Sequence, residues 1–477
     1  MPAHLEFDIR AGTAVRARRF GDAGQPMRLL LLGDFGGRNQ PLPLASRRPL
    51  RVDIDNFDSV MRRIAPRLVL EVGGATVILD LPSLDDFHPD RLCDKVDALR
   101  ALRETRARLH SKPTSTAAAA AGEDQTALLG RLLGRPPEAA VATAPADAMQ
   151  AWIHSLVAPH IVPATPVDQQ ALDRVDSSLA EPLRALLHAP DFHALEAAWR
   201  GAQWLVSRLE LNEDLQLHLL DVNREELLAD VAAAQGDLSS SGLCQVLCGP
   251  GSVAPDEPGW SLLTGLFSVG PGDDDLALLA GLGAIAARAG GPFVAAAGPA
   301  LYGCSTVDDL PEPRQWQPLA AEAAQHWSAM RHSAVATWIG LVAPRLLMRL
   351  PYGKATDPTE GFGFEEQPGA PVHETLLWGP GSLAVALLLG QAFTESSWGL
   401  AADQVQDVDD LPAYTFGHDG EPKLQPCAEA WLGERAGQTL LEHGVMPLLS
   451  HRQRASVRLM RMQSIAEPAQ ALEGPWG

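Results

Sequence analysis

The stretch from His188 to Val206, HAPDFHALEAAWRGAQWLV, constrains the fold of this 477-residue chain more than any other. Its apolar residues return every three or four positions, which is the spacing of one face of an α-helix. They are Phe192, Leu195, Ala198, Trp199, Ala202, Leu205 and Val206. Pro190 and Asp191 mark the helix start, because proline cannot continue a helix and aspartate caps one. The pattern predicts a helix over 191–208 with aromatic residues on its buried face.

The opposite face of this predicted helix carries Glu196, Arg200 and Gln203. Glu196 and Arg200 are four residues apart with the acid first, which is the favourable order for an ion pair along a helix. Gly201 costs roughly 1 kcal/mol relative to alanine inside a helix. A costly glycine beside large aromatic residues suggests that another backbone passes close to it. On these physical grounds alone, the stretch is an amphipathic core helix.

Composition narrows the classes of function. The chain has 38 basic and 59 acidic residues and a net charge of −21. This charge disfavours nucleic acids and anionic membranes as partners, because both attract basic proteins. The five cysteines are irregularly spaced, which indicates free thiols in a reducing cytosol. No apolar run reaches the length of a membrane span and no leader pattern opens the sequence, so we expect a cytoplasmic protein without membrane insertion.

A short strand is predicted at residues 3–9, where Leu5, Phe7 and Ile9 alternate with polar residues. The connection that follows it is long and polar. A strand on such a lead can pair with its own sheet or with the sheet edge of a neighbouring molecule. The sequence leaves both possibilities open.

A buried strand at 27–32 leads into the glycine-rich loop GDFGGR, which contains Asp34 and Phe35. A strand that runs into such a loop is typical of phosphate-binding sites. No Gly-Lys-Ser/Thr and no helical pattern follows, so a structural turn is the favoured interpretation. Residues 47–72 predict a strand, a helix and a strand, in which Asp55 or Asn56 caps a helix that buries Phe57. A second helix is predicted over 91–109.

Residues 111–150 are rich in alanine, threonine, proline and glycine, which is typical of a linker. Within this linker Leu128, Leu129, Leu132 and Leu133 form a one-sided apolar patch over two helical turns. Such a patch predicts a short helix that folds either against its own domain or against a partner.

Residues 151–297 alternate between helical and strand patterns, which is typical of an α/β domain. Helices are predicted near 152–157, over 172–187 and after an Asn223 cap, and a half-buried strand is predicted over 215–222. A helix from 275 and a strand over 292–297 follow. Cys244 and Cys248 are predicted to be buried strand thiols, because no second Cys/His pair completes a metal site.

Arg345 and Arg349 stand among apolar residues in the stretch 327–352. An unpaired buried charge is very costly, so Glu365 and Glu366 are the predicted partners. An anion clamp for catalysis is the alternative, but no nucleophile or base accompanies the arginines. Trp378 opens a turn that leads into a buried helix within 376–400. Because no catalytic, metal-binding or P-loop motif occurs, we expect no enzyme activity, cofactor or metal.

Several of these stretches resemble the large sheath subunit (TssC or VipB) of bacterial type VI secretion systems. The helix at 188–206 follows the pattern H-x-P-x-F-x-x-L-E-x-x-W-R-G-x-x-x-L-V, and residues 327–353 follow W-x-x-x-R-x-S … G-L-x-x-P-R-x-L-x-R-L-P-Y-G. The family also has F-x-F-x-E and L-W-G motifs downstream. The residues that carry these matches are Phe192, Glu196, Trp199, Arg200, Arg345, Arg349, Tyr352, Glu365, Glu366 and Trp378. One later pair departs from the family, since Trp398 precedes Gly399.

Residues 27–110 resemble the small sheath subunit (TssB or VipA). That family has a strand ending in GDFSGR, followed by I-x-x-D-N-F-x-x-V-x-x-x-x-x-P-x-L. The matching residues are Gly33, Asp34, Phe35, Gly37, Arg38, Ile54, Asp55, Asn56, Phe57, Val60, Pro66 and Leu68. The helical C-terminal part of that family is shortened in this chain.

The order of the two resemblances implies a one-chain fusion of both sheath subunits. The implied organisation is a TssB-like domain at 1–110, a linker at 111–150 and a TssC-like region at 151–477. The implied fold is α/β, with mixed sheets flanked by helices as in contractile tail sheaths of phages. Strands at the termini would be exchanged between subunits, with Leu5, Phe7 and Ile9 as candidates.

The resemblance also implies a structural role. Sheath subunits polymerise in six-fold rings around a tube of Hcp hexamers, and contraction drives that tube outward. The implied partners are further copies of the chain, Hcp, baseplate components and the AAA+ ATPase ClpV, which recognises a helix near the start of the large subunit. The patch at 128–133 occupies a similar position. Two alternatives remain: a sheath paralogue that acts as a cap, adaptor or assembly factor, and a soluble nucleotide-binding enzyme that uses the loop at 33–38.

Overall fold

The computed structural model describes residues 25–37, 42–72, 74–111, 169–249, 259–400, 406–418, 421–450 and 454–476. Three predictions lie outside these residues. They are the strand with Leu5, Phe7 and Ile9, the apolar patch with Leu128, Leu129, Leu132 and Leu133, and the helix near 152–157. The chain divides into two compact units, Met1–Val96 with Pro182–Gly477 and, separately, Asp97–Glu181. The domain limits at 110 and 150 stay a prediction.

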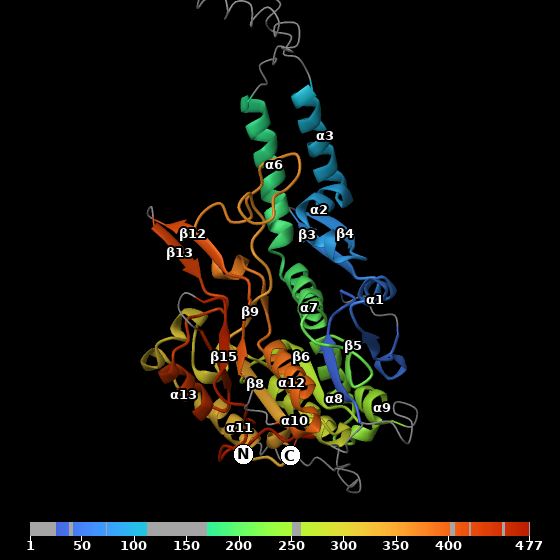
Figure 1. Cartoon of the computed structure of the whole chain (residues 1–477), viewed down its shortest axis with the longest axis vertical. Helices are drawn as coiled ribbons and strands as arrows, with labels where there is room; N and C mark the ends of the chain where they lie inside the picture. Colours follow the sequence, from blue (N-terminus) through green and yellow to red (C-terminus); the bar gives the residue numbers. More distant parts are fainter. Residues whose placement is uncertain are drawn as a thin grey trace, which may run out of the picture. The chain divides into compact units, whose positions relative to one another are not determined.

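The first unit is organised around one large mixed sheet flanked by helices, which confirms the predicted fold class (Figure 1). Nine strands of the described residues form it, in the order β11-β15-β14-β8-β7-β6-β1-β5-β2. The strands are β1 (Met27–Gly33), β2 (Leu50–Val52), β5 (Leu215–Asp221), β6 (Leu262–Val269), β7 (Phe293–Ala297), β8 (Ile339–Ala343), β11 (Asp407–Val408), β14 (Met446–Ser450) and β15 (Val457–Leu459). The central strands from β5 to β14 run parallel, while the strands at both edges are antiparallel.

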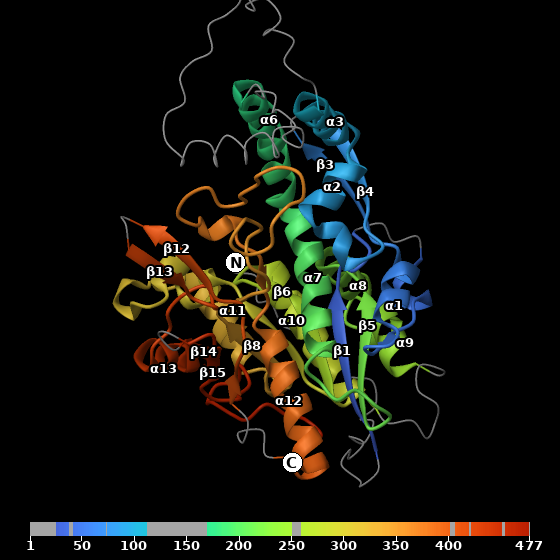
Figure 2. The ribbon, with the colours of Figure 1, turned by 45° about the horizontal axis from the view of Figure 1, so that its top comes forward.

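Strand β1 lies in the interior of this sheet, between β5 and β6. It pairs with β5 from Met27↔Leu215 to Gly33↔Asp221 and with β6 from Leu29↔Leu262 onward. All of its residues are buried, as expected for a parallel strand that is covered on both faces. Strand β5 is also buried on both faces, so the prediction of a half-buried strand is wrong for it. Figure 2 shows β1 and β5 running side by side.

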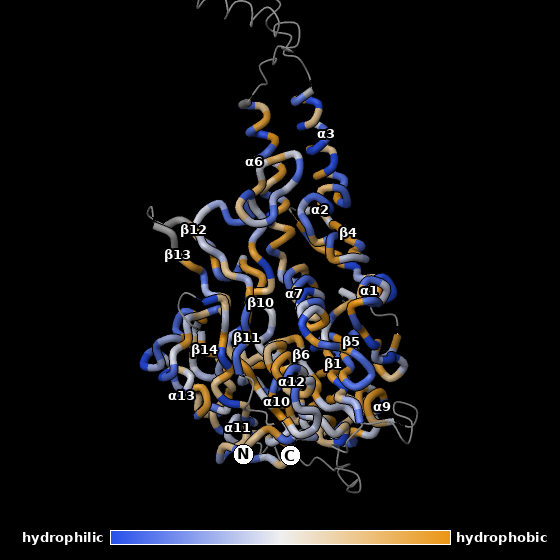
Figure 3. The backbone as a smooth tube through the Cα atoms, in the orientation of Figure 1, coloured by the Kyte–Doolittle hydropathy of each residue, from blue (hydrophilic) through white to orange (hydrophobic). Residues whose placement is uncertain are grey.

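Helices cover both faces of the sheet. One face packs on α8 (Arg224–Ala233), α9 (Gly242–Cys248), α10 (Asp273–Ala289), α11 (Ala321–Arg331) and α13 (Glu434–Glu442), and shares one apolar core with them. Helix α12 (Ser382–Ser396) contacts β1, β5, β6 and β7, and α7 (Pro190–Val206) contacts α12. Figure 3 shows that apolar residues concentrate along the sheet, α10 and α12.

Two sequence predictions concern helices α8 and α9. Asn223 caps α8 as predicted, because its side chain accepts the Glu226 N–H while the Glu226 side chain accepts the Asn223 N–H. Cys244 and Cys248 lie on helix α9 and not on a strand, so that prediction is wrong. Ser241 caps α9, and Asp230 binds the first free N–H groups of this short helix.

The region before residue 97 contains α1 (Phe57–Ile64), β3 (Arg67–Val72), β4 (Ala75–Asp80) and α2 (Pro89–Lys95). Asn56 precedes α1, but its side chain bonds to Asp53 and makes no cap bond to the helix. The predicted single helix over 91–109 is two helices. Val96 has extended backbone angles between α2 and α3 (Asp97–Ser111), so the helical pattern is interrupted there.

The second unit contains α3 and most of α6 (Gln169–Leu187), which confirms the helix predicted over 172–187. Arg106 of α3 forms an ion pair with Asp176 of α6, with an Nη2–Oδ2 distance of 3.2 Å. This pair is a polar contact between the two helices of the unit.

Short elements complete the described residues. Three two-stranded antiparallel sheets pair β9 (Leu346–Leu347) with β10 (Trp378–Gly379), β12 (Tyr414–His418) with β13 (Glu421–Gln425), and β3 with β4. The 3-10 turns are Leu44–Ser46, Leu84–Phe87, Leu238–Ser240, Pro299–Tyr302, Val307–Asp309, Pro313–Gln315, Ala336–Trp338, His373–Thr375 and Ser397–Gly399. Across the described segments, every helix is too short or too polar to cross a membrane.

Candidate functional site

Helix α7 is the element on which the candidate site is built. Ala189 occupies its N-cap position and Pro190 its first turn. Proline is favoured at the first helical position, where its missing N–H would have no helical partner. Asp191 lies in the first turn and does not cap the helix, so the predicted cap is displaced by two residues.

The predicted aromatic residues meet on the buried face of α7. Trp199 is fully buried and packs edge-on against Phe35 and Phe57, with ring centroids 5.1 Å and 5.7 Å away. Its indole Nε1 donates to the carbonyl oxygen of Phe35 over 2.9 Å. Phe192 packs in the same way against Phe87 at 5.4 Å. Helix α7 is therefore fixed by side chains from the region before residue 97.

Gly201 makes room for a side chain of helix α12. A Cβ atom at this position would lie 2.6 Å from the Cδ1 atom of Leu383. That distance is far below van der Waals contact. The close approach that the sequence suggested is real, but a leucine side chain makes it and not a second backbone.

Glu196 departs most from the sequence prediction. Predicted on the outward face of α7, its side chain is 0% exposed. The predicted ion pair with Arg200 forms, with an Nε–Oε1 distance of 2.7 Å. The same carboxylate also accepts from Arg349, over 2.7 Å from Nε and 3.2 Å from Nη2. The polar side of α7 is buried because the segment after β9 brings Arg349 onto it.

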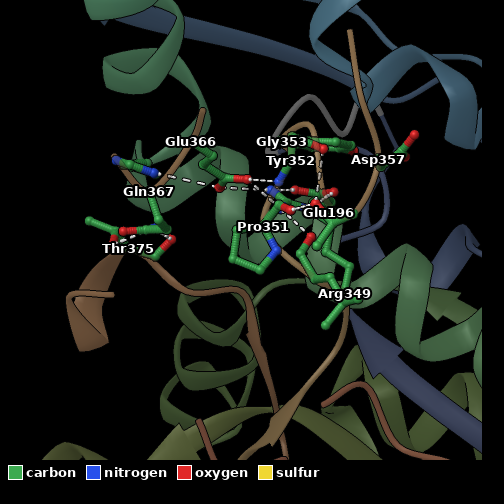
Figure 4. A network of polar contacts seen from close by, with 12 residues as sticks. Glu196, Arg349, Pro351, Tyr352, Gly353, Asp357, Glu366, Gln367 and Thr375 are labelled. Atoms are coloured by element: carbon green, nitrogen blue, oxygen red, sulfur yellow. Dashed lines mark hydrogen bonds and ion pairs between the residues drawn. The ribbon is translucent and has the colours of Figure 1, made fainter. Parts of the chain in front are cut away.

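Arg349 joins Glu196 to Glu366 in a buried network (Figure 4). Its Nη1 donates to Glu366 over 2.7 Å, and its Nη2 donates to the same carboxylate over 3.2 Å. Tyr352 closes the network: its N–H donates to Glu366 over 2.7 Å and its hydroxyl accepts from Arg200 over 2.9 Å. The guanidinium also lies 4.2 Å above the Tyr352 ring. Two acids and two arginines thus satisfy one another, and of the four only Arg200 is partly exposed.

The charges in this network hold one another in the ionised state. Burial alone would raise the pKa of Glu196, but Arg349 and Arg200 outweigh it and lower that pKa. Burial likewise opposes ionisation of Glu366, while Arg349 and the hydrogen bonds to His188 and Tyr352 bring its pKa down to about 2. The pKa of Tyr352 is raised to about 12, mainly by burial. We expect the network to keep its charges throughout the physiological pH range.

Two histidines border the network: His188, the first residue of the motif H-x-P-x-F, and His193, which no sequence pattern marked. The Nε2 atom of His188 lies 3.5 Å from a carboxylate oxygen of Glu366, and the His188 ring contacts that of His193. Burial and the nearby Arg349 charge lower the pKa of His193 to about 4. His193 is therefore neutral at physiological pH. A histidine in a helical pattern carries no sequence signal of such a role.

The segment from Arg349 to Glu366 also reaches the region before residue 97. The Asp90 carboxylate accepts from the Glu360 N–H over 2.8 Å. The His88 Nε2 atom lies 3.6 Å from Asp357, and its ring packs edge-on against Tyr352 at 5.1 Å. The segment therefore holds α7 on one side and the start of α2 on the other.

Arg345 has a different partner from the one predicted. Its Nε donates to Glu429 over 2.7 Å, and its backbone N–H donates to the same carboxylate over 2.8 Å. Of the predicted pairs, only Arg349–Glu366 forms. Glu365 accepts instead from the Lys354 N–H over 3.1 Å. Glu429 was missed because it lies 84 residues away along the sequence with no pattern that links it to Arg345.

A second, smaller cluster surrounds Glu429. His373 approaches the Glu429 carboxylate over 3.1 Å and stacks on the Trp378 ring, with centroids 5.4 Å apart. The Trp378 indole N–H donates to the His373 carbonyl over 2.8 Å. Trp378 is thus a structural residue that fixes His373. Arg345 and Arg349 are both neutralised by buried acids. An anion clamp would require those guanidinium groups to be available.

The glycine-rich loop after β1 uses its own amides internally. The Phe35 and Gly36 N–H groups donate to the Asp221 carboxylate over 2.8 Å and 2.9 Å, and the Gly37 N–H donates to Asp34 over 2.7 Å. In a phosphate-binding loop such amides point at the ligand. Burial raises the pKa of Asp221 to about 7, although the two N–H groups counteract it. This geometry fits a structural turn and not a nucleotide site.

The arrangement as a whole braces two parts of the chain against each other. Within the described segments, no group of three or more His, Cys, Asp or Glu residues is placed to hold a metal ion. The predicted residues Phe35, Phe57, Phe192 and Trp199 form the apolar half of the brace. Glu196, Arg200, Arg349, Tyr352 and Glu366 form its polar half.

Comparison with known proteins finds a matching family for each of the two parts of the chain. A family model described as the tail sheath N-terminal domain, VipB, matches residues 169–466. A second model, described as type VI secretion system VipA, matches residues 19–125.

Two curated proteins of Pseudomonas aeruginosa strain PAO1 are similar to the chain. The type VI secretion system sheath protein TssC1 is 28% identical over 302 residues, which is 62% of this chain and 61% of TssC1. The sheath protein TssB1 is 30% identical over 93 residues, which is 18% of this chain and 54% of TssB1. The chain therefore spans less than two thirds of the length of either relative.

Proposed function

Because this chain belongs to the VipB family of tail sheath proteins, we propose that it is a structural subunit of a type VI secretion system sheath, with small-subunit and large-subunit parts in one chain. In this role it polymerises around a tube of Hcp and contracts to propel that tube. It acts without catalysis, in the bacterial cytoplasm.

The position of β1 is the observation that carries this proposal. The VipA-like match contains β1, and the VipB-like match contains both neighbours of β1 in the sheet, β5 and β6. In Pseudomonas aeruginosa the corresponding relatives are two separate proteins. A shared sheet means that the two parts form one mechanical body, as a subunit of a load-bearing polymer requires.

The buried charges support the same role. The network of Glu196, Arg349 and Glu366 ties α7 to the segment that holds α2, so force applied to either part is transmitted to the other. Charged groups with several partners in fixed geometry are more directional than apolar contacts. Such bracing suits a subunit that must change its contacts with neighbours without unfolding.

Self-association is the central partner interaction of the proposal. Strands with open edges can pair with neighbouring molecules through main-chain hydrogen bonds. Leu5, Phe7 and Ile9 remain our candidates for an exchanged strand, and the leucines at 128–133 remain our candidates for a ClpV-recognised helix. Hcp and baseplate components complete the proposed set of partners.

Negative-stain electron microscopy of the chain, purified alone and together with Hcp, tests this function. Hollow ridged tubes of uniform width are expected, with an inner diameter that admits an Hcp tube. Single rings or monomers under both conditions would contradict the sheath role and favour a cap, adaptor or assembly factor at one end of another sheath. A nucleotide-binding assay on the same sample addresses the enzyme alternative, and binding at the loop 33–38 would revive it.

A further inference from the structure

Strand β1 has a sequence that specifies its own register only weakly. It reads MRLLLLG, and all of its residues are buried. A slide by two residues would keep every side chain on its original face and would exchange leucine for leucine at half of the run. Contacts outside the leucine run are therefore needed to fix the register of β1 against β5 and β6.

Two tryptophan indoles make such contacts, one at each end of β1. Gln25 lies two residues before the strand, and Phe35 lies two residues after it. The Trp398 Nε1 atom donates to the Gln25 carbonyl oxygen over 2.6 Å, and Trp199 Nε1 donates to that of Phe35 over 2.9 Å. Both carbonyl groups belong to the VipA-like part of the chain and both indoles to the VipB-like part.

Each indole is itself held in place. Trp398 packs edge-on against Phe393 of α12, with ring centroids 5.0 Å apart, as Trp199 of α7 packs against Phe35. Ser397, between α12 and Trp398, has a φ angle of 50°, which is unfavourable for a residue other than glycine. Strained backbone of this kind persists where the surrounding structure fixes it. The turn that presents Trp398 to Gln25 is therefore firmly placed.

The two indole bonds oppose sliding of β1 along its own axis. A slide by one residue displaces the strand by about 3.3 Å. The Gln25 and Phe35 carbonyl oxygens would then leave hydrogen-bonding distance of their indole donors. Because the bonds lie at opposite ends of the strand, both are lost whichever way the strand moves. The indoles thus add to the resistance of the main-chain ladder.

We propose that β1 is a force-bearing strand of the subunit and that Trp199 and Trp398 are positioning residues that pin its two ends to the VipB-like part. This inference rests on the proposed sheath function, in which subunits carry load. Tension that enters the chain ahead of β1 pulls along the strand from Gln25. The Trp398 bond lies at that point and passes part of the load to α12, while the Trp199 bond passes load to α7.

Optical-tweezers measurements on single molecules of the full chain test this inference. One handle is attached at the N-terminus and the other to a peptide tag inserted between residues 120 and 140, so that load enters β1 at Gln25. The variants Trp398→Phe and Trp199→Phe each keep an aromatic ring and lose the N–H donor. Each should raise the rate of the first rupture at fixed force by roughly two- to tenfold, as expected for the loss of one hydrogen bond.

Trp316→Phe is the matched control. Its indole N–H donates to the carbonyl oxygen of Asp309 over 3.0 Å, so the variant loses the same kind of bond between residues that lie seven positions apart. Its rupture rate should equal that of the wild type. A second control moves the first handle to the C-terminus, so that load no longer enters at Gln25. Under this load Trp398→Phe should rupture first at the wild-type rate, although a general loss of stability would act in both directions.

An unchanged rupture rate of Trp398→Phe under N-terminal load would overturn the inference, and so would an equal increase under both loads. Trp398 is half-buried, so this variant decides the test if the fully buried Trp199 does not tolerate replacement. The measurement uses single molecules and needs no polymer. Absence of tubes in the electron microscope would therefore contradict the proposed function, whereas an unchanged rupture rate would contradict the pinning of β1.

Discussion

Replacing Arg349 by methionine tests the buried network most directly. Methionine has a similar length and no charge, so the substitution removes the cation while largely conserving volume. Glu196 would keep Arg200 as a partner at 2.7 Å. Glu366 would keep the Tyr352 N–H at 2.7 Å and His188 at 3.5 Å, but it would lose the arginine partner that the described residues give it.

The size of the effect follows from burial. Arg349 has a side chain that is 7% exposed, and the side chains of its partners Glu196 and Glu366 are 0% and 1% exposed. Removing one member of a buried ion pair leaves an uncompensated charge and costs about 3–5 kcal/mol. The remaining contacts of Glu196 place this site toward the lower end of that range. Replacing Glu366 by glutamine in addition should recover part of the loss, because the orphaned charge is then removed.

Native-state hydrogen exchange on the backbone of α7 is the appropriate assay, because a chain of this size need not unfold in one step. A loss of 3–5 kcal/mol accelerates exchange by roughly two to four orders of magnitude when reclosing is faster than the chemical exchange step. Arg51→Met is the matched control: Arg51 pairs with Glu213 at 3.2 Å with side chains 36% and 87% exposed. Such a surface pair is worth about 1 kcal/mol or less.

Exchange in α7 that changes by less than tenfold in Arg349→Met would refute the reasoning. So would an equal effect in Arg51→Met, because the burial of the network would then not determine its strength. A loss in Arg349→Met that the added Glu366→Gln change does not reduce would also contradict it. The penalty would then come from lost packing of the arginine stem and not from an unpaired acid.

Two further predictions concern the strand β1 and its loop. Asp221 has a pKa raised to about 7 in the folded state, so the folded protein binds more protons than the unfolded chain between about pH 4 and pH 7. Its contribution to stability is therefore lost as pH rises from about 4 to about 7, and roughly 3 kcal/mol of it is lost between pH 5 and pH 8. The difference in urea midpoint between wild type and Asp221→Asn should shift in favour of the variant over that range. A pH-independent difference would contradict this. Cleavage at a protease site inserted between residues 120 and 140 should leave both fragments together in size-exclusion chromatography, because β1 is buried between β5 and β6. Separation of the fragments without denaturant would show that the shared sheet does not hold them.

Local sequence patterns predicted most of the elements because each depends on neighbours within a few residues. The apolar run at 27–32, the helix around Trp199 and the Asn223 cap all appear where the patterns indicate. The prediction of one helix over 91–109 is wrong at Val96, where the backbone is extended. The sequence has no proline or glycine there that would indicate a break. The pair at Cys244 and Cys248 was assigned to a strand because a short apolar run does not distinguish a strand from a seven-residue helix.

The site could be predicted only in part, because its contacts join residues far apart in sequence. The Glu196–Arg200 pair lies within one helical turn and was found; Glu196 with Arg349 spans 153 residues and was not. An acid at a helical position opposite the apolar face is normally solvated. Glu196 is buried because the segment after β9 places Arg349 against it. Helical periodicity carries no information about a contact with such a distant residue.

The location of Arg349 gives the network a second role besides stability. A buried pair within one part of the chain could be replaced by apolar residues at little cost. Here the charged groups come from α7 and from a segment that also contacts α2, so their geometry fixes a register between the VipB-like and VipA-like parts. Apolar side chains at the same positions would fill the volume, but they would allow the two parts to slide past each other. In a chain whose two parts are joined through residues 112–168, such a register holds the region before residue 97 and the VipB-like residues from Pro182 onward in one compact unit.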